Sequence, residues 1–428
     1  MEIQKLPKEL QFYILSKCDG DSLINSGKVC TLWLEIIDVL EKSFHIWTGK
    51  CLNEIPRRYL VQLTGIPELL DKRNDSYCKD VPWTFWKDVY FDYNRMSVVR
   101  DWIPERKVVM MPSQLNTCTA LRSRDNILVS GHIDGNVVLW KDEVEPGRFK
   151  LLTRHRSHVT AVDMLNTVES MKEVGEWVDG YTVVSVSRDS SIHVSNPLSD
   201  SVKNITLYRG SVNNLSCWGS KFVVAAESSI LNGQPVWKVD HDKTVNVLHE
   251  LYGHEESCIS AATCWNDQII SGDVIGNLYQ WKLNSTTRQQ CRPVIVAKFS
   301  ESYTKQIYFD GYILLCLLGD GSICWRVGNQ KFQTTPNKTE LEIFSATPTC
   351  LACRARLLVV GLNSGNVLVY YIATEESWLT FNPAVPTCRF RACSDSINCI
   401  DVCHDGNTPV IVVSSTNEGI SRFTFRPP

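Results

Sequence analysis

The sequence has no long hydrophobic run and no excess of charge of either sign. Its longest uncharged apolar run is YILLCLL at residues 312–318, far below the roughly 18 residues that a membrane-spanning helix needs. The first residues, MEIQK, lack the basic start and apolar stretch of a signal peptide. With 44 Lys and Arg against 47 Asp and Glu, the formal net charge is −3, so there is no overall positive field to hold nucleic acid. These features predict a cytoplasmic and/or nuclear protein with no membrane and no nucleic-acid partner.

Motifs for catalysis and metal binding are also missing. No G-x-S-x-G, P-loop, G-x-G-x-x-G or H-E-x-x-H pattern occurs. The pair Cys350-x-x-Cys353 has no second C-x-x-C at a zinc-like distance. The 17 cysteines, in a chain without a recognisable export signal, are typical of reduced and mostly buried thiols. We therefore expect no enzyme activity, no metal site and no cofactor.

The first 40 or so residues have the periodicity of short amphipathic helices. Leu6, Leu10 and Ile14 recur at every fourth position, with Leu15 beside them, and a second stripe runs through residues 29–40. Three short helices have too little interior to be stable alone, so their surplus of apolar residues predicts a partner surface. Periodicity alone would favour the alternative, an ordinary small helical subdomain whose stripe packs inward.

The order of residues in this segment resembles an F-box. LPKELxxxIL at 6–15, DSLI at 21–24 and VCTLW at 29–33 fill nearly every hallmark position of that module. The resemblance implies docking on the Skp-type adaptor of a cullin ubiquitin ligase. It also implies a set of residues for adaptor binding and internal packing: Leu6, Pro7, Leu10, Ile14, Leu15, Leu23, Val29, Cys30 and Trp33.

The segment that follows is rich in aromatic residues. Trp86, Val89, Tyr90 and Tyr93 recur at helical spacing, with charged residues on the other faces. An aromatic stripe of this kind is usually packed core. The pattern predicts a stiff helical connector.

From about residue 105 the pattern changes to short β-rich runs separated by turns. The clearest unit, Ile127 to Trp140, reappears at Ile269 to Trp281 with the same nine-residue step from glycine to tryptophan. Weaker copies follow a basic period of 43–45 residues with two insertions, which is the length of a four-stranded propeller blade. The tight-turn residues of the copies are Asp134, Asp189, Asn232, Ile275, Asp320, Ser364 and Glu418.

These repeats resemble a degenerate WD-repeat propeller, with seven blades as the best count. Lys107 to Met111 is a candidate strand for closing the last blade, which would leave no exposed sheet edge. No repeat ends in a literal Trp-Asp pair, and Gly253-His254 is the only Gly-His pair of the expected kind. We therefore expect the Ser–His–Asp–Trp hydrogen-bond set of strong WD repeats to be mostly missing.

Positive residues near one turn are candidates for substrate binding. Ser187-Arg188-Asp189 resembles blades whose turn arginine holds a phosphorylated or acidic degron, and an arginine fork suits that task. Arg154 and Arg156 lie in the neighbouring entry loop, residues 154–158, and are expected to add positive charge beside this turn. The equivalent turn positions of other blades carry no arginine, and a lone surface arginine is usually only solvated. An apolar or mixed substrate groove is at least as favoured as a degron pocket.

The expected fold is mixed: an all-α F-box at 1–45, a helical linker at 46–104 and an all-β WD-repeat propeller at 105–428. The expected function is that of a non-catalytic substrate receptor, with the F-box bound to a Skp-type adaptor and through it to a cullin, and the propeller bound to an unidentified protein target. Two alternatives remain: a propeller scaffold whose F-box is not engaged in a ligase, and, more remotely, a propeller enzyme.

Overall fold

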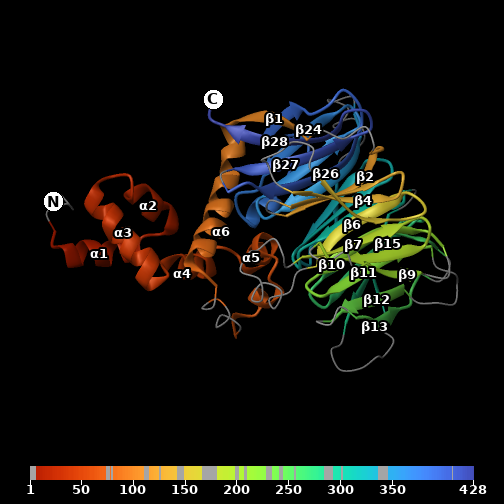
Figure 1. Cartoon of the computed structure of the whole chain (residues 1–428), viewed down its shortest axis with the longest axis horizontal. Helices are drawn as coiled ribbons and strands as arrows, with labels where there is room; N and C mark the ends of the chain where they lie inside the picture. Colours follow the sequence, from red (N-terminus) through yellow and green to blue (C-terminus); the bar gives the residue numbers. More distant parts are fainter. Residues whose placement is uncertain are drawn as a thin grey trace.

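A helical arm extends to one side of a ring of β-sheets (Figure 1). The computed structural model describes residues 6–73, 78, 81–109, 115–124, 127–141, 149–165, 181–197, 202–206, 210–227, 234–240, 244–254, 257–283, 293–299, 302–335, 346–406 and 408–428.

Short helices build the arm. Helix α2 begins after Asp19, whose carboxylate accepts a hydrogen bond from the Ser22 amide at 2.7 Å and so caps the helix. The α-helices are α1 (Lys8–Lys17), α2 (Gly20–Ser26), α3 (Thr31–Phe44), α4 (Ile46–Glu54), α5 (Arg57–Thr64) and α6 (Trp83–Arg95), and the 3-10 helices of this part are η2 (Pro67–Leu70) and η4 (Met96–Arg100). The expected aromatic connector is confirmed, because all four residues of its stripe are buried in α6.

The described residues beyond the arm form seven four-stranded antiparallel sheets, which are the blades of a propeller. Blade 1 comprises β2 (Cys118–Arg124), β3 (Ile127–His132), β4 (Asn136–Lys141) and β5 (Phe149–Arg154); blade 2 comprises β6 (Val159–Leu165), β7 (Thr182–Ser187), β8 (Ser191–Ser195) and β9 (Val202–Thr206). Blade 3 comprises β10 (Val212–Trp218), β11 (Lys221–Ala226), β12 (Gln234–Val239) and β13 (Val245–Leu251); blade 4 comprises β14 (Ile259–Trp265), β15 (Gln268–Asp273), β16 (Asn277–Lys282) and β17 (Val294–Lys298). Blade 5 comprises β18 (Thr304–Phe309), β19 (Ile313–Leu318), β20 (Ile323–Val327) and β21 (Gln333–Thr334); blade 6 comprises β22 (Pro348–Arg354), β23 (Leu357–Leu362), β24 (Asn366–Tyr371) and β25 (Cys388–Arg391), with 3-10 helix η7 (Glu376–Trp378) between its last strands. Blade 7 comprises β26 (Ile397–His404), β27 (Pro409–Ser415), β28 (Gly419–Arg426) and β1 (Ile103–Val109).

The ring is closed by a strand from the start of the propeller segment. Strand β1 pairs antiparallel with β28, from Ile103 opposite Arg426 to Val109 opposite Ile420. The expected closing strand and the count of seven blades are thus confirmed. Residues 110 and 111 of that expected strand lie outside the described residues, as does the expected turn residue Asn232.

Each blade has the same irregularity at the start of its first strand. In every blade the register between the first and second strands shifts at the second residue, which forms a β-bulge. In six blades the bulged side chain donates a hydrogen bond of 2.6 to 3.4 Å to the carbonyl of the first residue of the next blade. These donors are Thr119, Thr160, Asn213, Ser260, Thr349 and Asn398. We call these six bonds the junction bonds, because each fastens one blade to its neighbour.

Histidine–serine contacts occur in three blades, more than the single Gly-His pair indicates, but no described blade has the complete Ser–His–Asp–Trp set. In blade 4 His254 also contacts Asp273, while the Trp281 indole N–H has no hydrogen-bond partner among the described residues. In blade 4, His254 Nε2 lies 2.7 Å from the Ser271 hydroxyl, as the Gly-His pair predicts. Blade 2 has the same contact between His155 and Ser185 at 2.8 Å, although Arg154 replaces the glycine. In blade 1, His132 comes from the second strand itself and contacts Ser130 at 2.8 Å. The pattern search found one network and missed two, because a histidine can reach the serine from more than one position in the chain.

The helical arm is packed against the ring through polar contacts and a shared core. The Gln62 amide of α5 donates to the Tyr308 hydroxyl of blade 5 at 2.7 Å and accepts from the Ala355 amide of blade 6 at 2.6 Å. Asp92 of α6 pairs with Arg354 of blade 6 at 2.9 Å. One continuous hydrophobic cluster includes residues of the first helices, of the linker and of the blades. The arm and propeller therefore form one packed body.

Candidate functional sites

The expected adaptor-binding residues divide into a surface group and an interior group. Leu10, Ile14 and Val29 are exposed despite being apolar, at 49%, 38% and 54%. Pro7 is exposed, and Leu6, Cys30 and Trp33 are half-buried. Leu15 and Leu23 are almost completely buried within the arm. These two leucines cannot offer their side chains to another protein, so within the predicted set they belong to the internal packing.

A polar contact holds the surface group in place. The buried Gln11 side chain donates to the Leu6 carbonyl at 2.8 Å, and the Trp33 indole N–H donates to the Gln11 side chain at 2.7 Å. This chain of hydrogen bonds ties α3 to the residues that precede α1. It gives Trp33 a positioning role that periodicity alone did not reveal.

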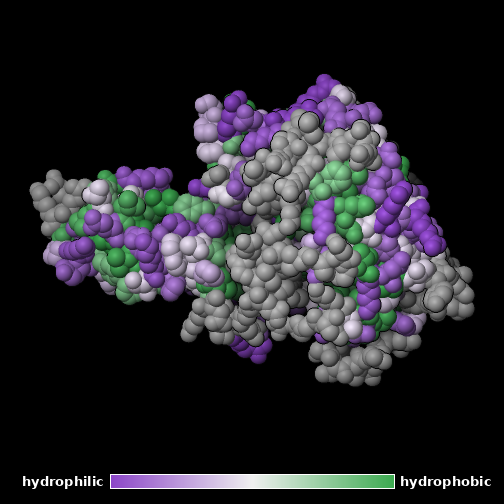
Figure 2. All heavy atoms as spheres, in the orientation of Figure 1, coloured by the Kyte–Doolittle hydropathy of each residue, from purple (hydrophilic) through white to green (hydrophobic). Residues whose placement is uncertain are grey.

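Sequence reasoning missed several exposed apolar residues of this segment, Tyr13 and Leu34 among them. Tyr13 and Leu34 are 61% and 55% exposed. Tyr13 follows Leu10 by three positions, so helical spacing places it on the same side of α1, which was the available signal. In the space-filling view, hydrophobic residues lie between hydrophilic ones on the surface of the helical arm (Figure 2). An apolar surface of this kind on a small helical unit is typical of a protein-binding site.

The second candidate site lies around the turn of blade 2. Arg188 is in the turn between β7 and β8, and its amide donates to the His158 carbonyl in the segment between β5 and β6. The Arg156 amide donates to the Asp189 carboxylate at 2.6 Å. These bonds bring the turn and the segment together, as expected from sequence. Arg154, Arg156 and Arg188 are exposed, and their guanidinium groups make no ion pair with any described residue. Their role in substrate binding remains a prediction.

A buried pair of histidines supports this part of blade 2. His155 stacks on His193 with ring centroids 3.8 Å apart, and its Nδ1 lies 2.6 Å from the Ser191 hydroxyl. Burial, and then the neighbouring His193, lower the pKa of His155 to about 3, while Asp189 acts in the opposite direction. Burial also lowers the pKa of His193. Both imidazoles are therefore neutral at physiological pH.

This pair predicts that acid destabilises the propeller. The unfolded chain binds a proton at His155 below a pH of about 6.5, whereas the folded chain does not until the pH approaches about 3. Stability is therefore expected to fall as the pH falls from about 6.5, by up to about 1.4 kcal/mol per pH unit for His155, and the lowered pKa of His193 acts in the same direction. We expect His155→Gln to flatten this dependence in denaturant unfolding at pH 7, 6 and 5. Equal slopes in the variant and the unmodified chain would contradict the assignment.

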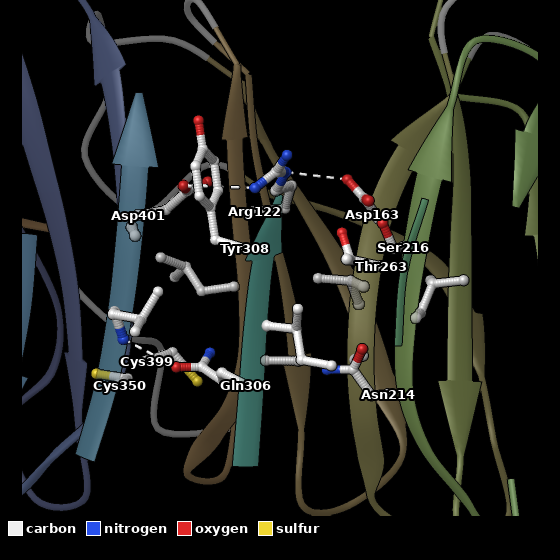
Figure 3. A pocket seen from close by; sticks show the side chains of 18 of the residues that line it. Arg122, Asp163, Asn214, Ser216, Thr263, Gln306, Tyr308, Cys350, Cys399 and Asp401 are labelled. Atoms are coloured by element: carbon white, nitrogen blue, oxygen red, sulfur yellow. Dashed lines mark hydrogen bonds and ion pairs between the residues drawn. The ribbon is translucent and has the colours of Figure 1, made fainter. Parts of the chain in front are cut away.

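The third feature is a central cavity of about 480 Å³. It is lined by the first strands of all seven blades and is bordered on one side by Val61 and Gln62 of α5. In Figure 3, Arg122 lies between Asp163 and Asp401, which come from the blades on either side. The Arg122 Nε atom is 2.9 Å from Asp163, and its Nη1 atom is 3.6 Å from Asp401.

The two carboxylates of this trio also bind backbone groups across blade boundaries. Asp401 accepts the Ser123 amide of blade 1 at 2.6 Å, and Asp163 accepts the Cys217 amide of blade 3 at 2.8 Å. The trio thus links blade 7 through blades 1 and 2 to blade 3. The three side chains pair with one another and with backbone amides, so this arrangement has a structural role: it holds neighbouring blades together.

Among the described residues, no group of three or more His, Cys, Asp and Glu side chains is arranged to hold a metal ion. The cysteines described are free thiols, and most of them are buried. No described helix is both long and apolar enough to cross a membrane.

Comparisons with known proteins agree with this architecture. Residues 3–45 match the F-box domain. A segment of 163 residues is 27% identical to the probable E3 ubiquitin ligase complex SCF subunit sconB of Arthroderma otae; it covers 34% of this chain and 23% of that protein. The structure is also similar to the β-propeller domain of Cps50 (Swd1) from Myceliophteria thermophila, with a TM-score of 0.54 and 12% identity over 75% of this chain and 99% of that one.

The matched domain and the ring of blades together define the class of this protein. It joins an N-terminal F-box domain to a seven-bladed β-propeller through a helical linker.

Proposed function

We propose that this protein is the substrate-recognition subunit of an SCF-type ubiquitin ligase. Its F-box docks a Skp-type adaptor and through it a cullin, while the propeller binds a protein target. Its contribution is proximity, because holding the target near the conjugating enzyme raises the effective concentration of target lysines. It carries out no chemical step of its own, and it acts in the cytoplasm, the nucleus or both.

The observation that carries this proposal is the apolar surface of the F-box domain. Leu10, Tyr13, Val29 and Leu34 each expose about half or more of their surface, although exposed apolar groups gain nothing from contact with water. The domain is small, and its own interior is already filled by residues such as Leu15 and Leu23. The remaining apolar surface is therefore available for a partner.

The joint between arm and ring supports the same function. Arg58 of α5 contacts Glu375 of blade 6 at 3.0 Å and Asp310 of blade 5 at 3.7 Å. With the contacts of Gln62 and Asp92, it fixes the arm relative to the propeller. A fixed arm keeps a bound target at a constant distance from whatever the F-box holds.

The adaptor assignment predicts a specific loss of binding. We expect Leu10→Asp to weaken adaptor binding by roughly 30-fold or more, because it places a charge in the centre of an apolar contact. Titration calorimetry of the purified chain with a Skp-type adaptor measures the effect. Ile103→Asp is the matched control, since Ile103 in β1 has the same exposure of 49% as Leu10 but lies outside the F-box.

Two results would overturn the proposal. If the unmodified chain does not bind the adaptor, the F-box serves another purpose and the protein is a propeller scaffold. If Leu10→Asp and Ile103→Asp bind the adaptor equally well, the exposed surface of α1 is not the docking site.

A further inference from the structure

Six of the seven blades form a junction bond from their bulged residue, and blade 5 does not. At the bulge of blade 5, the position filled elsewhere by threonine, serine or asparagine is occupied by Lys305. Lys305 makes no hydrogen bond to the Pro348 carbonyl, the equivalent acceptor in blade 6, nor to any other described residue. In the six other blades the residue at this position forms the junction bond, and Lys305 does not. The Lys305 side chain is therefore available for another role.

Lys305 lies at the edge of the central cavity and forms no ion pair with any described residue. It is exposed and belongs to the cavity lining. Its ammonium group is close enough to the Cys350 and Cys399 thiols of blades 6 and 7 to act on both electrostatically. The other bulge residues around this end of the cavity are neutral, and their polar groups are used in the junction bonds. A single cation in a neutral polar ring attracts an anion.

Apolar side chains are exposed beside this cation. Tyr303, two residues before Lys305, is 44% exposed, and Ile275 in the turn between β15 and β16 is 56% exposed. Gly276 of this turn lies very close to Phe299 of the segment before β18: a Cβ atom added to the glycine would lie 2.0 Å from the Phe299 carbonyl oxygen. The turn and the segment are therefore in contact. Exposed apolar residues of blades 4 and 5 therefore lie on the two segments that meet before β18, the strand that carries Lys305.

We propose that Lys305 binds a carboxylate side chain of the target protein, next to an apolar side chain held by Tyr303 and Ile275. This inference rests on the proposed function and names the chemistry of the segment that the propeller recognises: an aspartate or glutamate near a bulky apolar residue. A carboxylate fits better than a phosphate, because one ammonium group balances one negative charge. A phosphate carries nearly two charges and is usually held by several cations.

The test is a selection of peptides on the full chain. A library of random 12-residue peptides is panned against the unmodified protein, and the best peptide is remade with glutamine or phosphoserine in place of its acidic residue. We expect an acidic position among the selected peptides, and at least a tenfold loss of affinity for the glutamine version. Lys305→Thr removes the cation and restores a residue type that forms the junction bond in three blades. It is expected to cause the same tenfold loss while the protein remains at least as stable to heat.

Further variants complete the design. Lys305→Arg is expected to retain binding, since it keeps the charge. Lys282→Thr is the matched control, because Lys282 is also exposed but lies at the end of β16 and outside the cavity lining. The proposal is overturned if no acidic position is selected, if Lys305→Thr binds the peptide as the unmodified chain does, or if the phosphoserine peptide binds more tightly than the acidic one. Adaptor binding by the same preparations tests the proposed function separately.

Discussion

Replacing Arg122 with methionine is expected to lower the free energy of unfolding by about 3 kcal/mol, the cost of removing one partner from a buried ionic group. Asp163 and Asp401 are only 7% and 6% exposed, and Arg122 is the cation placed between them. Without it, two like charges face each other across the cavity. Both carboxylates keep their backbone donors, which limits the loss to the lower part of the usual range.

Denaturant unfolding of the purified chain measures this effect. Arg154→Met is the control, because Arg154 is exposed and forms no ion pair with any described residue; we expect it to change stability by less than about 0.5 kcal/mol. A triple variant with Asp163→Asn and Asp401→Asn should recover part of the loss, since the three groups act as a unit. If Arg122→Met is as stable as Arg154→Met, the trio is not a fastener of the ring.

Replacing Arg58 with methionine is expected to cost about 3 to 5 kcal/mol and to loosen the arm. Asp310 is 2% exposed, and burial raises its pKa while Arg58 opposes that shift. Removing Arg58 leaves this carboxylate buried without its counter-charge and breaks the contact with Glu375. The same guanidinium group also stacks on Tyr59 and Tyr312, 4.7 and 4.6 Å from the ring centroids.

Hydrogen exchange distinguishes local from global effects in this variant. We expect amides of α5 and α6 to lose protection more than those of the central blade strands, because the joint is the element directly weakened. Arg73→Met is the control: the Arg73 side chain is 89% exposed and, among the described residues, its ion pair is with the nearby Asp71. Uniform loss of protection across the chain would show that Arg58 stabilises the whole body and not the joint in particular.

Much of the architecture was readable in the sequence, because local patterns carry it. The F-box hallmarks lie within about 30 consecutive residues, and each turn of the repeat is set by a few neighbouring residues. Gly135, at such a turn, has φ of 86° and a backbone so close to His155 that a Cβ atom would lie 2.3 Å from its carbonyl oxygen. A search for Gly-His pairs that precede a blade still missed His155, which follows Arg154, and His132, which lies within β3, since the same contact can be made from different positions.

The sequence indicated some residues of the candidate sites and not others, because exposure and contacts between distant residues depend on packing. Helical spacing marked Leu10 and Leu15 alike as members of one apolar set, but only packing decides that Leu10 is exposed and Leu15 is buried. Arg188 and Arg156 were singled out by a local motif, and the structure does place their backbones side by side. Lys305 carried no motif at all. It stands out only when the seven bulges are compared.

The sequence by itself determined the order of the domains, the period of the blades and the identity of the F-box, since each depends on residues near one another in the chain. Only the tertiary structure decided which groups meet across the ring. Asp401 binds the Ser123 amide across 278 residues, and Gln62 contacts Tyr308 across 246. Such contacts follow from closing the ring and packing the arm on it, because a side chain far along the chain becomes a neighbour only when the backbone between them has folded.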